Sequence, residues 1–211
     1  DQGRVNGVAF DVALFTNLTR DHLDYHGTLA AYGAAKARLV HWPGLRAAVI
    51  NARDAFGRTL IANARAHRQK IISYGADGAD ITALEVQTVP AGMAVRVGTP
   101  QGSGQVTVPV SGMFNVQNLL GVLGVLLASE VELKPALDAL AHLTPPPGRM
   151  ERFGGNSAPL VIVDYAHTPD ALEKVLAAIR PTLEPHGRLV CVFGCGGNRD
   201  RGKRAQMGSV A

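Results

Sequence analysis

The stretch FTNLTRDHLDYHGTLAAYGAAK, residues 15–36, joins an apolar segment to a helix through a short polar loop. Residues 8–16, VAFDVALFT, are predicted to form a buried strand, and Thr28 is a preferred N-cap for a helix over 29–40. The loop between them carries acids and imidazoles, namely Asp21, His22, Asp24 and His26. Because open α/β sheets bind ligands just past the carboxyl ends of their strands, this loop is the first candidate site.

The alternation of strand and helix continues downstream and predicts an α/β fold with parallel strands. Further strands are expected at 47–51 and 70–75, and helices at 55–66, 115–129 and 134–143. Residues 81–111 are rich in valine and threonine and are interrupted by glycine and proline, which predicts an antiparallel meander. The first part of the chain is therefore expected to hold a mixed sheet.

The segment TPPPG, residues 144–148, is the best candidate for a domain linker, because consecutive prolines fit neither a helix nor a central strand. It divides the chain into predicted domains of residues 1–147 and 148–211. The second domain is expected to begin with strands at 160–165 and 188–194 around a helix at 169–183. Thr168 as N-cap and Pro169 at the first helical position mark the start of that helix.

The composition is that of an ordinary globular protein. With 211 residues, 46% of them hydrophobic, the chain can bury one large core or two modest ones. The net charge of +4 comes from scattered residues, so we expect no nucleic acid as partner. No stretch approaches the roughly 18 apolar residues of a membrane span, so no membrane partner is expected either. Cys191 and Cys195 are expected to be reduced thiols, which fits a cytoplasmic protein.

Lys36 lies on the helix face of Leu29, Tyr32 and Val40, which should pack on the sheet. Such a lysine either buries its stem and extends the ammonium to water, or is a buried amine that acts as nucleophile or is carbamylated by carbon dioxide. Carbamylation would create an anionic oxygen ligand. With the acids and imidazoles of the loop it would suit magnesium or manganese, whereas a solvated loop is the plain alternative.

Three further motifs place polar side chains near helix starts or the linker. Asn115 and Asn118 of GMFNVQNLL lie on one side of a first helical turn, where they either cap the helix or bind the edge of a purine. Arg149 follows the prolines, and is either solvated or paired with phosphate. Asp164 and His167 of VDYAHTPD belong either to an ordinary βα turn or to a site for a ribose or a phosphate.

The last motif, GCGGNRDRGKR at 194–204, is a glycine-rich turn followed by basic residues. Its cationic side chains could bind a carboxylate or a phosphate, and a solvated helix start is the alternative. It is not a Walker loop, since G-x-x-x-x-G-K-[ST] occurs nowhere in the 211 residues.

Taken together, these stretches resemble the Mur ligases of bacterial peptidoglycan synthesis. The resemblance is carried by DQGRV, FTNLTRDHLDYHG, AAK, GMFNVQNLL, GRMERF, VDYAHTPDALEKVL and VFGCGGNRDRGKR, in that order. It implies an incomplete central ATPase domain followed by the start of a Rossmann-like C-terminal domain. It also implies a monomeric, ATP- and Mg²⁺-dependent amide-bond ligase that phosphorylates the D-glutamate carboxylate of a UDP-N-acetylmuramoyl dipeptide and joins it to a diamino acid.

The resemblance also implies roles for individual residues. His22 and a carbamylated Lys36 would be the magnesium ligands and catalytic residues, supported by Asp21 and Asp24. The implied ATP contacts are Asn115, Asn118, Arg149, Asp164 and His167. Gln2 and Arg4 would hold the UDP-N-acetylmuramoyl substrate, and Arg199 would hold a carboxylate of the incoming amino acid.

Arg199 in GGNRD and the wider similarity favour meso-diaminopimelate as that amino acid. A lysine-adding ligase of the same family, a folylpolyglutamate synthetase and a metal-dependent phosphohydrolase are the alternatives. Parts of the family pattern are missing, namely the Walker loop, the N-terminal uridine-binding domain and an acidic magnesium ligand upstream of Asp1.

We therefore expect the isolated 211 residues to bind ATP weakly and to catalyse no ligation, because the phosphate-binding loop is missing. An assay of phosphate release from ATP, with and without the UDP-N-acetylmuramoyl dipeptide, checks this. Release that depends on the dipeptide would contradict it.

Overall fold

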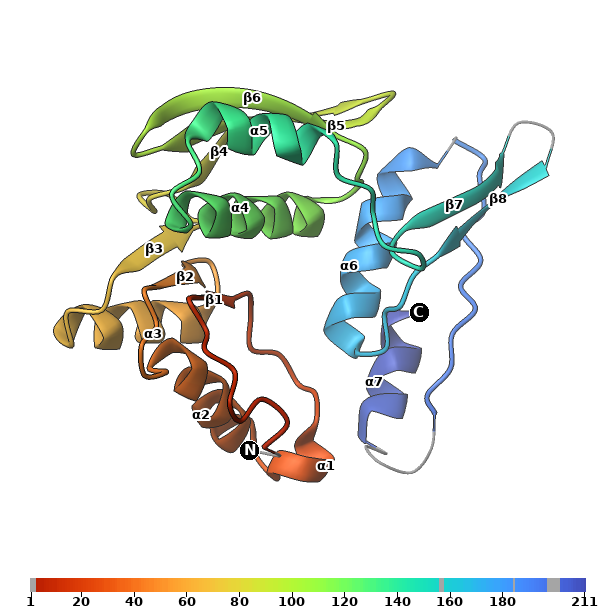
Figure 1. Ribbon diagram of the computed structural model, residues 1–211. Coiled ribbons are helices and arrows are strands. Elements are labelled where there is room, and N and C mark those ends of the chain that lie inside the picture. The colour runs from red at the N-terminus through yellow and green to blue at the C-terminus, as the bar shows by residue number, and fades with distance from the viewer. Residues whose placement is uncertain (1–2, 156–157, 184, 197–201) are drawn as a thin grey trace.

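The computed structural model describes residues 3–155, 158–183, 185–196 and 202–211. The described chain folds into two bodies joined by the proline segment after residue 143, as Figure 1 shows. The first body contains two sheets and most of the helices, and the second contains a hairpin and two helices. The first candidate site lies where the two bodies face each other.

A three-stranded parallel sheet forms the base of the first body, with its second strand in the middle. The strands are β1 (Val12–Phe15), β2 (Ala47–Asn51) and β3 (Ile71–Tyr74). One face is covered by α2 (Leu29–Val40) and α3 (Ala55–Ala66), and the other by α4 (Met113–Ala128). Ala48 and Ile50 pack with α2 and α3, whereas Ala47 and Val49 pack with α4. Because β2 is buried on both faces, its sequence is a continuous apolar run.

A second sheet is an antiparallel meander that lies on the far side of α4 (Figure 1). It consists of β4 (Thr82–Val89), β5 (Gly92–Thr99) and β6 (Gly102–Val108), with α5 (Leu133–Ala141) packed on β6. Helix α4 carries no charged residue, as expected for a helix buried between two sheets. Within the described residues, no helix is long and apolar enough to cross a membrane.

Two glycines let α4 approach the parallel sheet closely. A methyl group at Gly121 would lie 3.1 Å from the Tyr74 ring, and one at Gly124 would lie 2.5 Å from Cγ1 of Val49. The Tyr74 hydroxyl donates to the Phe15 carbonyl oxygen at 3.3 Å, and burial, with the nearby Asp54 charge, raises the pKa of that hydroxyl. The spacing of two small residues on one helix face therefore fixes how near the helix comes to the strands.

A surface ion cluster ties the ends of three elements together. The Arg46 guanidinium, just before β2, donates from Nη2 and Nε to the Asp11 carboxylate, with Nη2 at 2.6 Å. Its Nη1 reaches Glu130, just after α4, at 3.2 Å. The hydrogen bond from Arg46 lowers the pKa of Asp11 below its usual value. All three groups are at least partly exposed, so we assign the cluster a modest share of the stability.

The second body is smaller, and its strands form a hairpin. Strands β7 (Glu151–Gly155) and β8 (Ala158–Val163) pair antiparallel. Helices α6 (Pro169–Ile179) and α7 (Gly202–Val210) pack on each other through a small core of Leu172, Leu176 and Met207. Thr168 caps α6 by accepting from the Ala171 N–H, as predicted.

The elements of the first body confirm the sequence analysis to within a few residues, except that β1 starts at Val12 instead of residue 8. In the second body, the predicted strand at 188–194 is wrong, because described residues 185–196 contain no strand. Val190 and Val192 are 73% and 94% exposed there. Strand β7, the hairpin partner of β8, was not predicted, and among the described residues no strand pairs with residues 188–194. The predicted helix to residue 183 ends at Ile179, because Pro181 offers no N–H and a 3₁₀ turn follows.

We expect Gly124→Ala to lower the free energy of unfolding by about 1–3 kcal/mol, because the added methyl group overpacks α4 against β2. Urea unfolding followed by circular dichroism checks this. The matched control is Gly208→Ala in α7, where an added methyl group meets nothing within 4 Å. The control should be neutral or stabilising by up to about 1 kcal/mol, and equal losses for both variants would contradict the packing explanation.

Candidate functional site

The polar loop leaves β1 at Phe15 and turns into the short helix α1 (Leu23–His26) at His22. His22 has a φ of 53°, in the left-handed region that residues other than glycine rarely adopt. Its backbone N–H donates to Oδ1 of Asp21 at 2.9 Å. The carboxylate thus holds the turn that presents the imidazole, which is 61% exposed.

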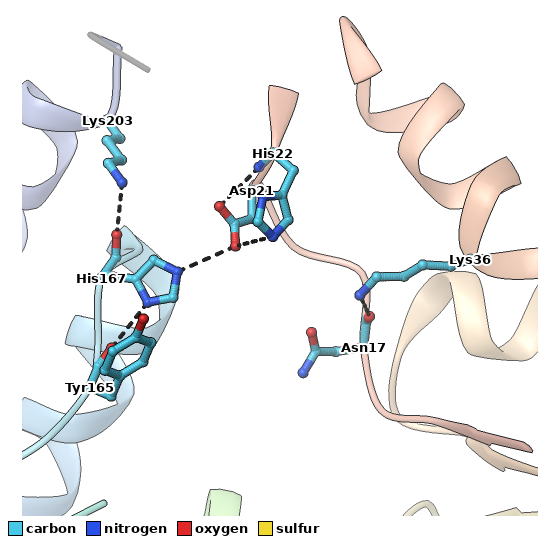
Figure 2. A network of polar contacts seen from close by, with 7 residues as sticks. All are labelled: Asn17, Asp21, His22, Lys36, Tyr165, His167 and Lys203. Atoms are coloured by element: carbon cyan, nitrogen blue, oxygen red, sulfur yellow. Dashed lines mark hydrogen bonds and ion pairs between the residues drawn. The ribbon is translucent and has the colours of Figure 1, made fainter. Parts of the chain in front are cut away.

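Oδ2 of Asp21 also contacts two imidazoles, as Figure 2 shows. Nε2 of His22 lies 3.3 Å from it, and Nε2 of His167, from the loop between β8 and α6, lies 3.4 Å from it. Asp21 therefore contacts both the loop of the first body and the turn of the second body. Asp24 is exposed, and within the described chain it makes no polar contact.

The Lys36 ammonium points to the loop that follows β1 (Figure 2). Its Nζ donates to the Asn17 carbonyl oxygen at 2.9 Å and lies 4.7 Å from the centroid of the Tyr32 ring. The expectation that this face of α2 packs on the sheet is correct at Val40, which is buried, but wrong at Leu29, which is 43% exposed. Lys36 is half-buried, and its hydrogen bond to Asn17, two residues past β1, places the ammonium at the sheet's carboxyl edge.

Tyr32 is a residue that the sequence analysis did not assign to the site. Its ring stacks on His26 with a centroid distance of 4.9 Å and meets His22 edge-on at 5.8 Å. It therefore touches three of the candidate polar groups, counting the Lys36 ammonium above. The spacing of four residues between Tyr32 and Lys36 on one helix is the signal that could have found it.

A cleft of about 880 Å³ opens beside this loop. Its walls include the polar residues Arg4, Asn6, Thr16, His22, His26 and Lys36. The chain's single tryptophan, Trp42, lines the same cleft and packs edge-to-face on Phe10 at 5.3 Å. The structure therefore brings the predicted residues Arg4, His22 and Lys36 to one cavity.

The donor set of the cleft fits Mg²⁺ on the condition that Lys36 is carbamylated. Among the described residues, no group of three His, Cys, Asp or Glu side chains is arranged to hold a metal. Mg²⁺ usually keeps waters and takes only one or two protein ligands together with substrate phosphates. His22 and Lys36 supply such a pair if Lys36 is carbamylated, because an ammonium would repel the cation. Both side chains line the cleft, so their placement allows it.

The residues predicted to contact ATP lie outside this cleft and are held by local bonds. Both oxygens of Asp164 accept backbone N–H groups, from Met150 at 3.0 Å and from Ala166 at 2.8 Å. The Arg149 guanidinium lies 4.9 Å from the Tyr165 ring centroid. Asp164 therefore joins the start of β7 to the turn after β8, a structural role that the sequence analysis did not include.

The two asparagines lie together at the first turn of α4. Nδ2 of Asn115 donates to the Ser111 carbonyl oxygen at 2.8 Å, and Nδ2 of Asn118 donates to Oδ1 of Asn115 at 3.4 Å. Asn115 thus anchors the helix start, and Asn118 is the more exposed of the two. Gln2 and Arg199, the other two predicted substrate contacts, lie outside the described residues.

Comparison with known proteins shows the family of this chain. The Mur ligase middle domain matches residues 1–126, and the Mur ligase glutamate ligase domain matches residues 148–211. The chain belongs to the Mur ligase family. Among curated Mur ligases, the UDP-N-acetylmuramoyl-L-alanyl-D-glutamate--2,6-diaminopimelate ligase of Ectopseudomonas mendocina (strain ymp) is 54% identical over 213 residues. That of Pseudomonas aeruginosa is 50% identical over 211 residues.

The chain spans 43% of the length of these Mur ligases, and they cover all of it. A solved structure of a UDP-N-acetylmuramoyl-L-alanyl-D-glutamate--2,6-diaminopimelate ligase superposes with a TM-score of 0.73 at 41% identity, over all of this chain and 43% of that one. A Mycobacterium tuberculosis folylpolyglutamate synthase gives a TM-score of 0.66 at 23% identity, over 82% of this chain and 40% of that one. At that identity, the second likeness concerns the fold alone.

We expect Asp164→Ala to lower the free energy of unfolding by about 1–3 kcal/mol, since the Met150 and Ala166 N–H groups lose their acceptor. Urea unfolding of the chain, without nucleotide, measures the loss. Glu173→Ala, at an exposed position on α6, is the control and should change stability little. Unchanged stability of Asp164→Ala would show that this carboxylate has no structural role.

Proposed function

We propose that the full-length protein is an ATP-dependent ligase that adds meso-diaminopimelate to UDP-N-acetylmuramoyl-L-alanyl-D-glutamate. The observation that supports it most is that His22 and Lys36 line one cleft at the carboxyl edge of the parallel sheet. The identity of 54% with a ligase of that name, over the whole of this chain, supports the choice of substrates. The free thiols of Cys191 and Cys195 fit a cytoplasmic reaction.

The reaction has two steps in which atoms are conserved. A carboxylate oxygen of D-glutamate attacks the γ-phosphorus of ATP, and the bond to ADP breaks, which gives an acyl phosphate. The amine of the diamino acid then attacks the acyl carbon, phosphate leaves, and the amine loses a proton. The first step brings the carboxylate and ATP, both anions, together, so cationic groups must balance the charge. Bound Mg²⁺ would supply most of that balance, held by His22 and the carbamate of Lys36.

The contacts of Lys36 fit carbamylation. In that reaction the neutral amine forms a bond to the carbon of CO₂ and gives up a proton, so the cation becomes an anion. The nitrogen of a carbamate keeps one N–H, and the Asn17 carbonyl can accept from it as it accepts from the amine at 2.9 Å. One contact therefore holds the nitrogen in place in both forms, and the new oxygens extend beyond it.

The remaining predicted residues would act around this centre. Arg4 lines the same cleft and would bind the UDP-N-acetylmuramoyl substrate. Asn118, positioned by Asn115, would bind adenine, because its carboxamide is exposed at the first turn of α4. Arg149 would pair with phosphate, since its planar guanidinium can donate two parallel hydrogen bonds.

Ligation by the full-length protein tests the proposal. From ATP, the UDP-N-acetylmuramoyl dipeptide and meso-diaminopimelate, with Mg²⁺ present, we expect ADP, phosphate and a UDP-N-acetylmuramoyl tripeptide to form. Little tripeptide should form when lysine replaces meso-diaminopimelate. Lys36→Ala should lower kcat by at least about a thousandfold, and Lys36→Arg should not restore it, because arginine forms no carbamate. Carbon-13 NMR after incubation with ¹³CO₂ should show a carbamate signal in the wild type that is absent from Lys36→Ala.

The matched control is Lys134→Ala, which removes an exposed lysine of α5 that pairs with Asp138. It should retain wild-type activity and the carbamate signal. A wild-type protein that releases phosphate without forming a peptide product would overturn the ligase assignment in favour of a phosphohydrolase.

A further inference from the structure

We infer that Asp21 is a positioning residue that joins the two bodies of the protein at the site of ligation. Its carboxylate accepts from the loop of the first body and contacts the turn of the second body at the same time. The inference rests on the proposed function, because it concerns how Arg149 and the cleft are brought together.

The contacts of Asp21 divide between its two oxygens. Oδ1 accepts the His22 N–H at 2.9 Å and so fixes the left-handed turn of the loop. Oδ2 lies 3.3 Å from Nε2 of His22 and 3.4 Å from Nε2 of His167. The carboxylate is 26% exposed, whereas the two imidazoles are 61% and 50% exposed, so Asp21 is the most enclosed of the three groups.

His167 is itself held in place on the second body (Figure 2). Its Nδ1 lies 3.0 Å from the Tyr165 carbonyl oxygen. Its own carbonyl oxygen accepts from Nζ of Lys203 on α7 at 3.2 Å. The ring and the backbone of His167 are therefore both in contact with neighbouring groups, and its Nε2 faces Asp21.

That turn is connected to the residues expected to bind ATP. Asp164, directly after β8, accepts hydrogen bonds from the N–H groups of Ala166 in the turn and of Met150 before β7. Arg149 is the neighbour of Met150 and lies over the ring of Tyr165. A contact that locates His167 therefore also locates the Arg149 guanidinium relative to the loop of His22. Asp21 is the group of the first body that makes this contact.

The experiment is a double-mutant cycle in the full-length ligase, with Asp21→Asn, His167→Ala and both together. Asn can still accept the His22 N–H, so the loop should keep its turn. We expect each single change to lower kcat/KM for ATP by about tenfold, and the double change to cost no more than the larger single change. His167→Gln should recover much of the loss, because a carboxamide can donate to Asp21. The matched control is Asp138→Asn, which changes an exposed acid of α5 outside the site and should keep wild-type kinetics.

Hydrogen exchange measured by mass spectrometry separates this role from a local one and does not depend on turnover. Asp21→Asn should speed exchange in residues 164–168, and His167→Ala should speed exchange in residues 16–26, so each change acts on the other body. Exchange that rises only in the mutated segment, or kinetic losses that multiply in the double variant, would overturn the inference. If the wild type forms no peptide product, the proposed function fails instead, and reciprocal exchange still supports the contact.

Discussion

The close packing of α4 between two sheets is the constraint on which the rest of the first body depends. Gly121 and Gly124 remove the side chains that would hold the helix away from the strands. The helix then covers one face of β2 with uncharged residues, while α2 and α3 cover the other face. Because both faces of the sheet are closed by helices, its carboxyl edge is the place where polar side chains can gather. Asn17, His22 and Lys36 lie around that edge.

The carboxyl edge also explains why the site is built from loops and helix starts. The loop after β1 supplies Asp21 and His22, and α2 brings Lys36 back over it. The second body contributes His167 from the corresponding position after its own strand β8. Each body thus offers the segment that follows one strand, and ligands held between them would be reached from both sides. For the parallel sheet of the first body, this is the general location of ligands in open α/β sheets.

Local signals predicted most of the fold. The helices after Thr28 and Thr168 were predicted because a capping residue and an apolar periodicity are both visible in a short window. Strand β7 was missed because ERFGG is short, ends in two glycines and shows no alternation. The predicted strand at 188–194 failed for a related reason. An apolar run forms a strand only where a partner strand lies beside it, and that depends on distant parts of the chain.

The sequence analysis named several residues of the candidate site but not the contacts between them. Spacing and resemblance indicated His22 and Lys36, and both line the cleft. The role of Tyr32 and the contact of Asp21 with His167 were not predicted, because they join groups whose approach is set by tertiary packing. Asp164 shows the opposite case. It was expected to contact the nucleotide, but its carboxylate accepts hydrogen bonds from two backbone N–H groups of its own chain.

Trp42 gives the cleft an optical property that follows from its position. It is the chain's single tryptophan, and its indole lines the same cavity as His22 and Lys36 while packing edge-on against Phe10. Indole emission responds to the polarity around the ring, so anything that displaces water from this cavity changes the intrinsic fluorescence of the chain. Occupancy of the cleft can therefore be followed without attaching a dye.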